Sequence, residues 1–167
     1  MAAPAPSARP SIRRSARWSS CGAHRLLLER HWDGGTGLVG FVMLNPSVAD
    51  AERDDPTIRR CIGFARTWGF GGLLVANLFT LASTDPRRLA RARERNHPDA
   101  DLALRDVAAR SDLVIEAWGA NALCVLRADR AHELLQPTAT ADLGCTRSGA
   151  PRHPLYVRAA TRPHPRA

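Results

Sequence analysis

Four segments of the chain are apolar over most of their length and are bounded by glycine, proline or polar residues, a pattern typical of β-strands. The predicted strands are residues 26–32, 38–44, 72–79 and 112–118, and 143–146 is a further short candidate. Glu29 and Arg30 interrupt the first strand, which is therefore expected at an edge of the sheet. The turn Asp33-Gly34-Gly35 predicts that this strand forms an antiparallel hairpin with the second.

Segments with helical periodicity alternate with these strands. Asp55 before Pro56 predicts a capped helix start, and apolar residues then recur at helical spacing. Helices are predicted at residues 56–68, 98–111 and 127–136. Strand, helix and strand in succession make a βαβ unit, which is nearly always right-handed. The predicted fold class is α/β: a three-layer α/β/α sandwich with a mainly parallel central sheet and an antiparallel edge strand.

The net charge of +8 on this 167-residue chain comes mainly from its two ends. All 24 basic residues are arginines; four lie in residues 1–17 and three in 158–167, and neither stretch contains an acid. We predict a disordered basic arm over residues 1–22, a single α/β domain over 23–157 and a basic tail over 158–167. The charge of the domain itself is near neutral and supports a nucleic-acid partner only weakly.

The composition, 44% hydrophobic and 24% charged, is that of a globular protein. The four cysteines have no C-x-x-C spacing, which excludes zinc-knuckle and thioredoxin motifs and favours reduced thiols in a cytoplasmic protein. No apolar run reaches the roughly 18 residues of a membrane span, so no membrane association is expected. Phosphate-loop and dinucleotide-binding motifs are absent, and we expect neither a cofactor nor a resident metal. The sequence leaves the oligomeric state open.

Ligands of an open α/β sheet bind beyond the carboxyl ends of its strands. The residues that this rule selects are Asn45, Pro46, Ser47, Asn77, Trp118, Gly119, Arg152 and His153. Asn45 is the most informative, because its amide offers a donor and an acceptor and Pro46 restricts its backbone. The alternative is an Asn that satisfies backbone groups in a turn. His153 could donate to a developing anion, or could stack on Tyr156.

Four acidic residues lie within one short loop over residues 50–55: Asp50, Glu52, Asp54 and Asp55. Carboxylates this close could bind Mg²⁺, but their order lacks the central Gly and terminal Glu of a calcium-binding loop, and one of them is needed as a helix cap. A solvated acidic loop is favoured, and a metal-dependent enzyme remains the weakest hypothesis.

Several motifs follow one another in a fixed order between about residues 26 and 157. They are Met43-Leu44-Asn45-Pro46-Ser47, Asp55-Pro56-Thr57-Ile58-Arg59-Arg60-Cys61, Asn77-Leu78-Phe79, Trp118-Gly119 and Pro151-Arg152-His153-Pro154-Leu155-Tyr156. With these motifs the chain closely resembles a bacterial family known as domain-of-unknown-function family 1643. That resemblance implies no activity.

A remoter similarity is to the uracil-DNA glycosylase superfamily. Its members look alike in having a strand that ends in a G-x-N-P or G-x-D-P type motif, an Asn on the second strand and a final loop containing H-P. This resemblance implies that Asn45 positions a water molecule, Asn77 reads the edge of the base and His153 stabilises the negative charge of the leaving base. Pro46, Ser47, Trp118, Gly119 and Arg152 would complete the substrate-binding set.

Two main functions follow from these observations. The first is a glycosylase-like hydrolase acting on a base in nucleic acid or in a nucleotide, with Asn45 and His153 as catalytic residues. The alternative is a non-catalytic module that binds a nucleotide or nucleic acid in the same cleft.

Overall fold

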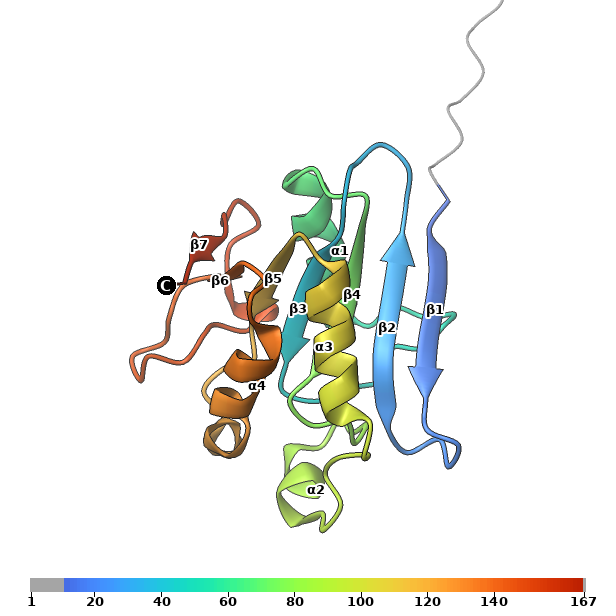
Figure 1. Ribbon diagram of the computed structural model, residues 1–167, viewed down its shortest axis with the longest axis vertical. Coiled ribbons are helices and arrows are strands. Elements are labelled where there is room, and N and C mark those ends of the chain that lie inside the picture. Colours follow the sequence, from blue (N-terminus) through green and yellow to red (C-terminus); the bar gives the residue numbers. More distant parts are fainter. Residues whose placement is uncertain (1–10, 167) are drawn as a thin grey trace, which may run out of the picture.

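A seven-stranded sheet forms the centre of the molecule, which the computed structural model describes over residues 11–166 (Figure 1). Its strands are β1 (Arg13–Trp18), β2 (Arg25–His31), β3 (Val39–Met43), β4 (Gly72–Asn77), β5 (Leu113–Glu116), β6 (Thr140–Asp142) and β7 (His164–Pro165). Their order in the sheet is β1-β2-β4-β3-β5-β6-β7. The four strands β4, β3, β5 and β6 run parallel, and antiparallel strands flank them on both sides. The predicted mixed α/β fold with a parallel centre is confirmed.

The three helices predicted at residues 56–68, 98–111 and 127–136 begin and end close to those limits, and further short helices were not predicted. They are α1 (Pro56–Thr67), α2 (Pro86–Arg91), α3 (Ala100–Arg110) and α4 (Ala128–Leu135), with short 3₁₀ helices η1 (Ala122–Leu126) and η2 (Pro154–Tyr156). The Asp55 carboxylate caps α1, since its Oδ1 accepts a hydrogen bond of 2.8 Å from the backbone of Ile58. The predicted cap and helix start are therefore confirmed.

Both faces of the central strands are buried under helices. Phe41 and Val75 face a cluster that includes the apolar side of α1, whereas Val42 and Leu74 face a second cluster formed with α3 and α4. In Figure 1, α3 and α4 lie in front of the sheet and α1 lies behind it. Burial on both faces explains why the predicted central strands are continuously apolar.

The predicted hairpin between β2 and β3 is wrong. β2 pairs with β4, and β3 pairs with β4 and β5, so β4 lies between the two expected partners. The turn after Asp33 does not connect paired strands. Instead, the backbone of residues 34–37 crosses that of residues 69–72 at contact distance. A Cβ atom on Gly35 would lie 2.3 Å from the carbonyl oxygen of Phe70. Glycine is required here for close approach of two backbones rather than for a hairpin.

The prediction of a disordered arm over residues 1–22 is wrong for the part that the structure describes, and residues 1–10 lie outside it. β1 pairs with β2 along its whole length and takes the edge position expected of β2. Its sequence, RRSARW, has no apolar period because most of its side chains are exposed. Charged side chains are typical of an edge strand and oppose pairing with other chains.

The basic tail over residues 158–167 also contributes to the sheet. β7 pairs with β6, and Arg166 contacts two buried carboxylates, with Nε 3.2 Å from Glu116 and Nη1 3.0 Å from Asp142. The last parallel strand, β6, ends just before residues 143–146, where a strand was predicted.

Two glycines provide a matched test of the packing between β3 and α3. A Cβ atom on Gly40 would lie 2.5 Å from Cγ1 of Val107, whereas one on Gly63, in α1, would meet nothing within 4 Å. We expect Gly40→Ala to lower the free energy of unfolding by about 1–3 kcal/mol through overpacking. Gly63→Ala should raise it by about 0.5–1 kcal/mol, because alanine favours helix. Urea denaturation measures both, and equal effects would contradict the packing described.

The edge strand β1 can be tested by truncation. A chain that begins at residue 19 loses β1, which leaves the hydrogen-bonding groups on one side of β2 without strand partners. We expect its thermal midpoint to fall by about 5 °C or more relative to a chain that begins at residue 11. Equal midpoints in calorimetry would show that β1 contributes nothing to stability.

Candidate functional site

A cavity of about 420 Å³ lies beyond the carboxyl end of β3 and beside the start of α1. Its volume is within the range of small-molecule sites in proteins. The wall combines charged, amide, imidazole and aromatic groups, among them Arg25, Asn45, Asp55, Trp118, His153 and Tyr156. The position agrees with the rule that selected the candidate residues from the sequence.

Five of the eight predicted site residues line this cavity: Asn45, Ser47, Trp118, Gly119 and His153. Arg152 lines a neighbouring hollow instead, and Pro46 is buried next to the wall without lining it. Asn77 does not reach the cavity; it is only 2% exposed, and its Oδ1 accepts a hydrogen bond of 3.3 Å from Arg25. A residue that reads the edge of a bound base must touch that base, so Asn77 does not serve this role in the geometry observed.

The side chain of Asn45 holds the rim of the cavity together. Its Nδ2 donates to the backbone oxygens of Pro46, at 3.0 Å, and of Ser83, at 2.9 Å. The amide hydrogens of Asn45 therefore satisfy backbone groups in a turn, as the alternative interpretation of this residue predicted. Within residues 11–166, no group donates a hydrogen bond to its Oδ1. That oxygen is left free to accept a hydrogen bond from water or from a ligand.

His153 lines the cavity, and its surroundings favour the neutral form of its imidazole. Burial lowers its pKa, an effect that the nearby Asp55 carboxylate partly opposes. The backbone N–H of Leu155 donates to Nδ1 at 3.4 Å, so the proton of the neutral ring is on Nε2. Nε2 is then a hydrogen-bond donor. The ring also contacts Tyr156, with ring centroids 5.8 Å apart and ring planes tilted by 51°. His153 therefore contacts the aromatic ring and lines the cavity at the same time.

Asp55 is a cavity residue that the sequence indicated only as a helix cap and as part of the acidic loop. One carboxylate oxygen caps α1, and the side chain also lines the cavity and influences the pKa values of Arg25 and His153. A carboxylate 8% exposed and close to an imidazole can stabilise a positive charge or accept a proton. The Asp-Pro cap motif could have pointed to it, since α1 begins where the cavity lies.

Arg25 is the second residue that the sequence did not indicate. Its side chain is almost completely buried, and it donates to the backbone oxygen of Ala49 at 2.9 Å as well as to Asn77. Its Nε has no hydrogen-bond partner among the described residues. Burial lowers the pKa of this guanidinium to about 10, and Asp55 partly opposes the shift. A polar residue before an apolar strand is ordinarily at the surface, so no signal predicted this position.

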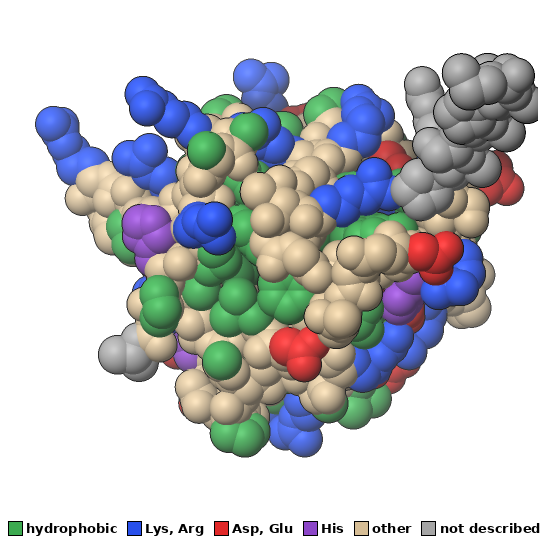
Figure 2. Space-filling view, turned by 90° about the horizontal axis from the view of Figure 1, so that it is seen from above, with side chains coloured by type: hydrophobic (Ala, Val, Ile, Leu, Met, Phe, Trp, Pro, Cys, Tyr) green, Lys and Arg blue, Asp and Glu red, His purple; other side chains and the backbone are tan. Residues whose placement is uncertain are grey.

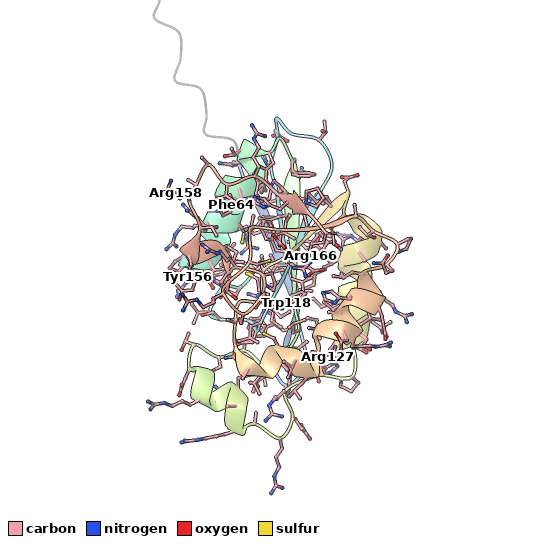
Figure 3. All side chains as sticks on the ribbon, turned by 90° about the vertical axis from the view of Figure 1, so that its left-hand side faces the viewer. Phe64, Trp118, Arg127, Tyr156, Arg158 and Arg166 are labelled. Atoms are coloured by element: carbon pink, nitrogen blue, oxygen red, sulfur yellow. The ribbon has the colours of Figure 1, made fainter. Side chains whose placement is uncertain are left out.

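Aromatic residues bound the cavity at two depths. Trp118 is 4% exposed and lies in the interior, while Tyr156 is 79% exposed on η2 beside α1 (Figure 3). Gly119 follows Trp118 with φ +77°, a left-handed conformation that favours glycine, and its N–H donates to Pro151. This bond joins the end of β5 to the loop that carries His153. The loop is thereby held over the cavity.

The acidic loop has its own partners. Oδ1 of Asp50 accepts from the backbone of Glu52 and Arg53, Asp54 pairs with Arg30, and Asp55 caps α1. Within residues 11–166, no group of three His, Cys, Asp or Glu residues is arranged to hold a metal ion. The carboxylates of Asp50, Asp54 and Asp55 thus stabilise local structure, and nothing in their geometry favours the metal-dependent hypothesis.

Comparison with protein families identifies the chain. The model of a family described as "Protein of unknown function (DUF1643)" matches residues 25–155. The chain belongs to this family. The match includes β2, the whole parallel centre of the sheet, the cavity residues Arg25, Asn45 and Asp55, and His153. No curated protein and no solved structure matches the chain, so the function of this DUF1643 member has to be argued from its own geometry.

Seven arginines of this DUF1643 protein form ion pairs with carboxylates within the described residues. They are Arg14, Arg17, Arg30, Arg110, Arg127, Arg130 and Arg166. On the face seen in Figure 2, the described Arg side chains form separate groups around the rim, with hydrophobic side chains between them. Such a distribution differs from the continuous basic stripe of many nucleic-acid-binding proteins. Among residues 11–166, no helix has both the length and the apolar character needed to cross a bilayer.

The state of His153 can be tested by an NMR titration of its ring protons. Because burial disfavours the imidazolium, we expect a pKa below the ordinary value of about 6.5. Asp55→Asn should lower it further, since Asn keeps the helix cap but removes the opposing negative charge. A pKa at or above the ordinary value would contradict this effect of partial burial on the ring.

The same titration sets the sign of a stability effect. The unfolded chain binds a proton at His153 before the folded protein does as the pH falls. This contribution to the free energy of unfolding is therefore present above the unfolded pKa and is lost as the pH falls from there towards the folded pKa. His153→Asn should reduce this part of the pH dependence.

Proposed function

We propose that this DUF1643 protein is a glycosylase-like hydrolase that cleaves the N-glycosidic bond of a nucleotide or of a base in nucleic acid. The observation that carries the proposal is that Asn45 and His153, far apart in the sequence, line one cavity of about 420 Å³ together with Asp55. The proposal takes the helices on both faces of the sheet as a three-layer α/β/α sandwich, as the similarity to the uracil-DNA glycosylase superfamily implies. It includes a cytoplasmic location, where nucleotides are abundant.

The attacking water would be held by Asn45. Its Oδ1 accepts a hydrogen bond from the water, while its Nδ2 is immobilised by the backbone oxygens of Pro46 and Ser83. A side chain fixed in this way loses little further entropy when it orients a reactant. Because an amide is a very weak base, the water proton needs another acceptor, and the Asp55 carboxylate in the same cavity supplies one.

The leaving base would be stabilised by His153. As the bond between C1′ and the base nitrogen breaks, its electron pair moves onto the base, and the sugar gains oxocarbenium character. The Nε2–H group of the neutral ring donates to the developing negative charge. The water oxygen then bonds to C1′ and its proton passes to Asp55, which releases it to solvent, while the departing base takes up one proton from solvent. The carboxylate also stabilises the positive charge of the sugar.

A non-catalytic nucleotide-binding module is the second candidate. It is favoured by the position of Asn77, which is buried behind Arg25 and so offers no group for reading the base. Binding would then depend on Trp118, Tyr156 and backbone groups, and no bond would be cleaved. Turnover distinguishes the two candidates.

Base release from a panel of uracil-containing oligonucleotides, nucleotides and nucleosides, followed by chromatography, tests the hydrolase. We expect Asn45→Ala to reduce turnover by about 100-fold or more, and His153→Ala by about 10- to 100-fold. Asn45→Asp should retain part of the activity, because an oxygen acceptor remains. The exposed His164 provides a matched control, and His164→Ala should leave turnover unchanged.

Two results would contradict the hydrolase. One is the absence of base release from every substrate in the panel, and the other is release at equal rates by wild type and Asn45→Ala. Nucleotide binding without base release would favour the binding module instead.

A further inference from the structure

A second hollow, of about 400 Å³, adjoins the candidate cavity. We call it the outer hollow. The two share part of their walls, since both are lined by Gly119, Ala120, His153 and Tyr156. The outer hollow is completed by Thr146, Arg147 and Arg152. A ligand bound in the candidate cavity can therefore extend past the His153 ring into a region of different chemistry.

The arginines of the outer hollow belong to a tight loop between β6 and η2. Residues 145 and 151 form an antiparallel bridge, and the backbone N–H groups of Thr146 and Gly149 close the turn between them. Nε of Arg152 donates to the backbone oxygen of Cys145 at 2.9 Å, which fixes the start of its guanidinium across the loop. The outer hollow thus has a supported backbone and one partly immobilised cation.

The positive charges of the outer hollow have no acidic partner among the residues that line it. Arg147 and Arg152 are both exposed, no acidic residue lines the outer hollow, and among the described residues neither arginine forms an ion pair with a carboxylate. Elsewhere many arginines are paired, as Arg127 is with Asp101 at 2.6 Å. Two unpaired guanidinium groups in one hollow favour an anion.

We propose that the outer hollow binds the phosphate group of a nucleoside phosphate whose base and sugar occupy the candidate cavity. The identity of the nucleoside rests on the proposed function, whereas the phosphate site rests on Arg147 and Arg152 alone. The guanidinium groups donate to the phosphate oxygens, for which their planar arrangement of N–H groups is well suited. The hydroxyl of Thr146 adds a further donor.

The charges favour a free nucleotide over a base within a polymer. A terminal phosphate monoester carries about −1.5 to −2 charges near neutral pH, against −1 for a phosphodiester, and so matches two cations better. Binding a base within a nucleic-acid strand would also require further cationic groups of the protein along the phosphates of that strand.

Calorimetric titration with the four common nucleoside 5′-monophosphates and the four matching nucleosides tests the outer hollow. At least one monophosphate should bind wild type about 10- to 100-fold more tightly than its nucleoside. Arg147→Ala with Arg152→Ala should abolish most of this difference. Replacing both arginines by Lys should keep part of the preference for the monophosphate, because Lys carries the positive charge but lacks the planar guanidinium group. Arg93 is exposed and lies outside both cavities, so Arg93→Ala is the matched control.

Equal affinities of wild type for nucleotide and nucleoside, or no binding by any member of the panel, would overturn the inference. So would a double Ala variant that keeps the preference for phosphate. A pentanucleotide that binds more tightly per site than the monophosphate would overturn the choice of a free nucleotide. Phosphate-dependent binding without base release would leave the phosphate site standing and remove the hydrolase.

Discussion

The buried guanidinium of Arg30 is the interaction on which the rest of the structure depends. Its side chain is completely buried in β2 and forms an ion pair of 2.7 Å with Asp54. Further hydrogen bonds reach the backbone oxygens of Ser15 in β1 and of Asp50 and Arg53 in the acidic loop. Breaking a buried, hydrogen-bonded ion pair generally costs about 3–5 kcal/mol, because the remaining charge has no water around it. One side chain thus joins the edge of the sheet to the loop that precedes α1.

This constraint reaches the candidate site through the acidic loop. Arg30 holds residues 50–54, Arg25 from the same strand holds Ala49, and Asp55 then caps α1 beside the cavity. The acidic loop, for which the sequence favoured a solvated loop over a metal site, binds the guanidinium of Arg30. Its role is to place Asp55 at one side of the cavity, opposite in charge to Arg25. A site built on such supports is preorganised, which both proposals require.

Some charged side chains form ion pairs inside the fold, whereas others line the cavities without such partners. Glu116 and Asp142, both buried, each form an ion pair with Arg166 near the carboxyl end of the chain. Arg147 and Arg152 have no such partners among the described residues, although they come from a chain in which cations outnumber acids by 24 to 16. The excess of arginine by itself indicated little. The informative difference is between arginines that form ion pairs within the fold and arginines that line the outer hollow without a carboxylate partner.

The sequence by itself determined the local structure: the central strands, the Asp55 cap of α1 and the ends of most helices, because periodicity and capping act over a few residues. It also predicted Asn45 and His153 at the carboxyl ends of the strands, since parallel strands end on one side of a sheet. Only the tertiary structure decided that β4 lies between β2 and β3, that residues 13–18 form a strand, and that Asn77 is hidden behind Arg25. The place of β4 and the burial of Asn77 depend on contacts between distant segments, which burial and hydrogen bonding across the whole fold decide. Residues 13–18 pair with the nearby β2, but their mostly exposed side chains carry no hydrophobic period from which a strand could be predicted.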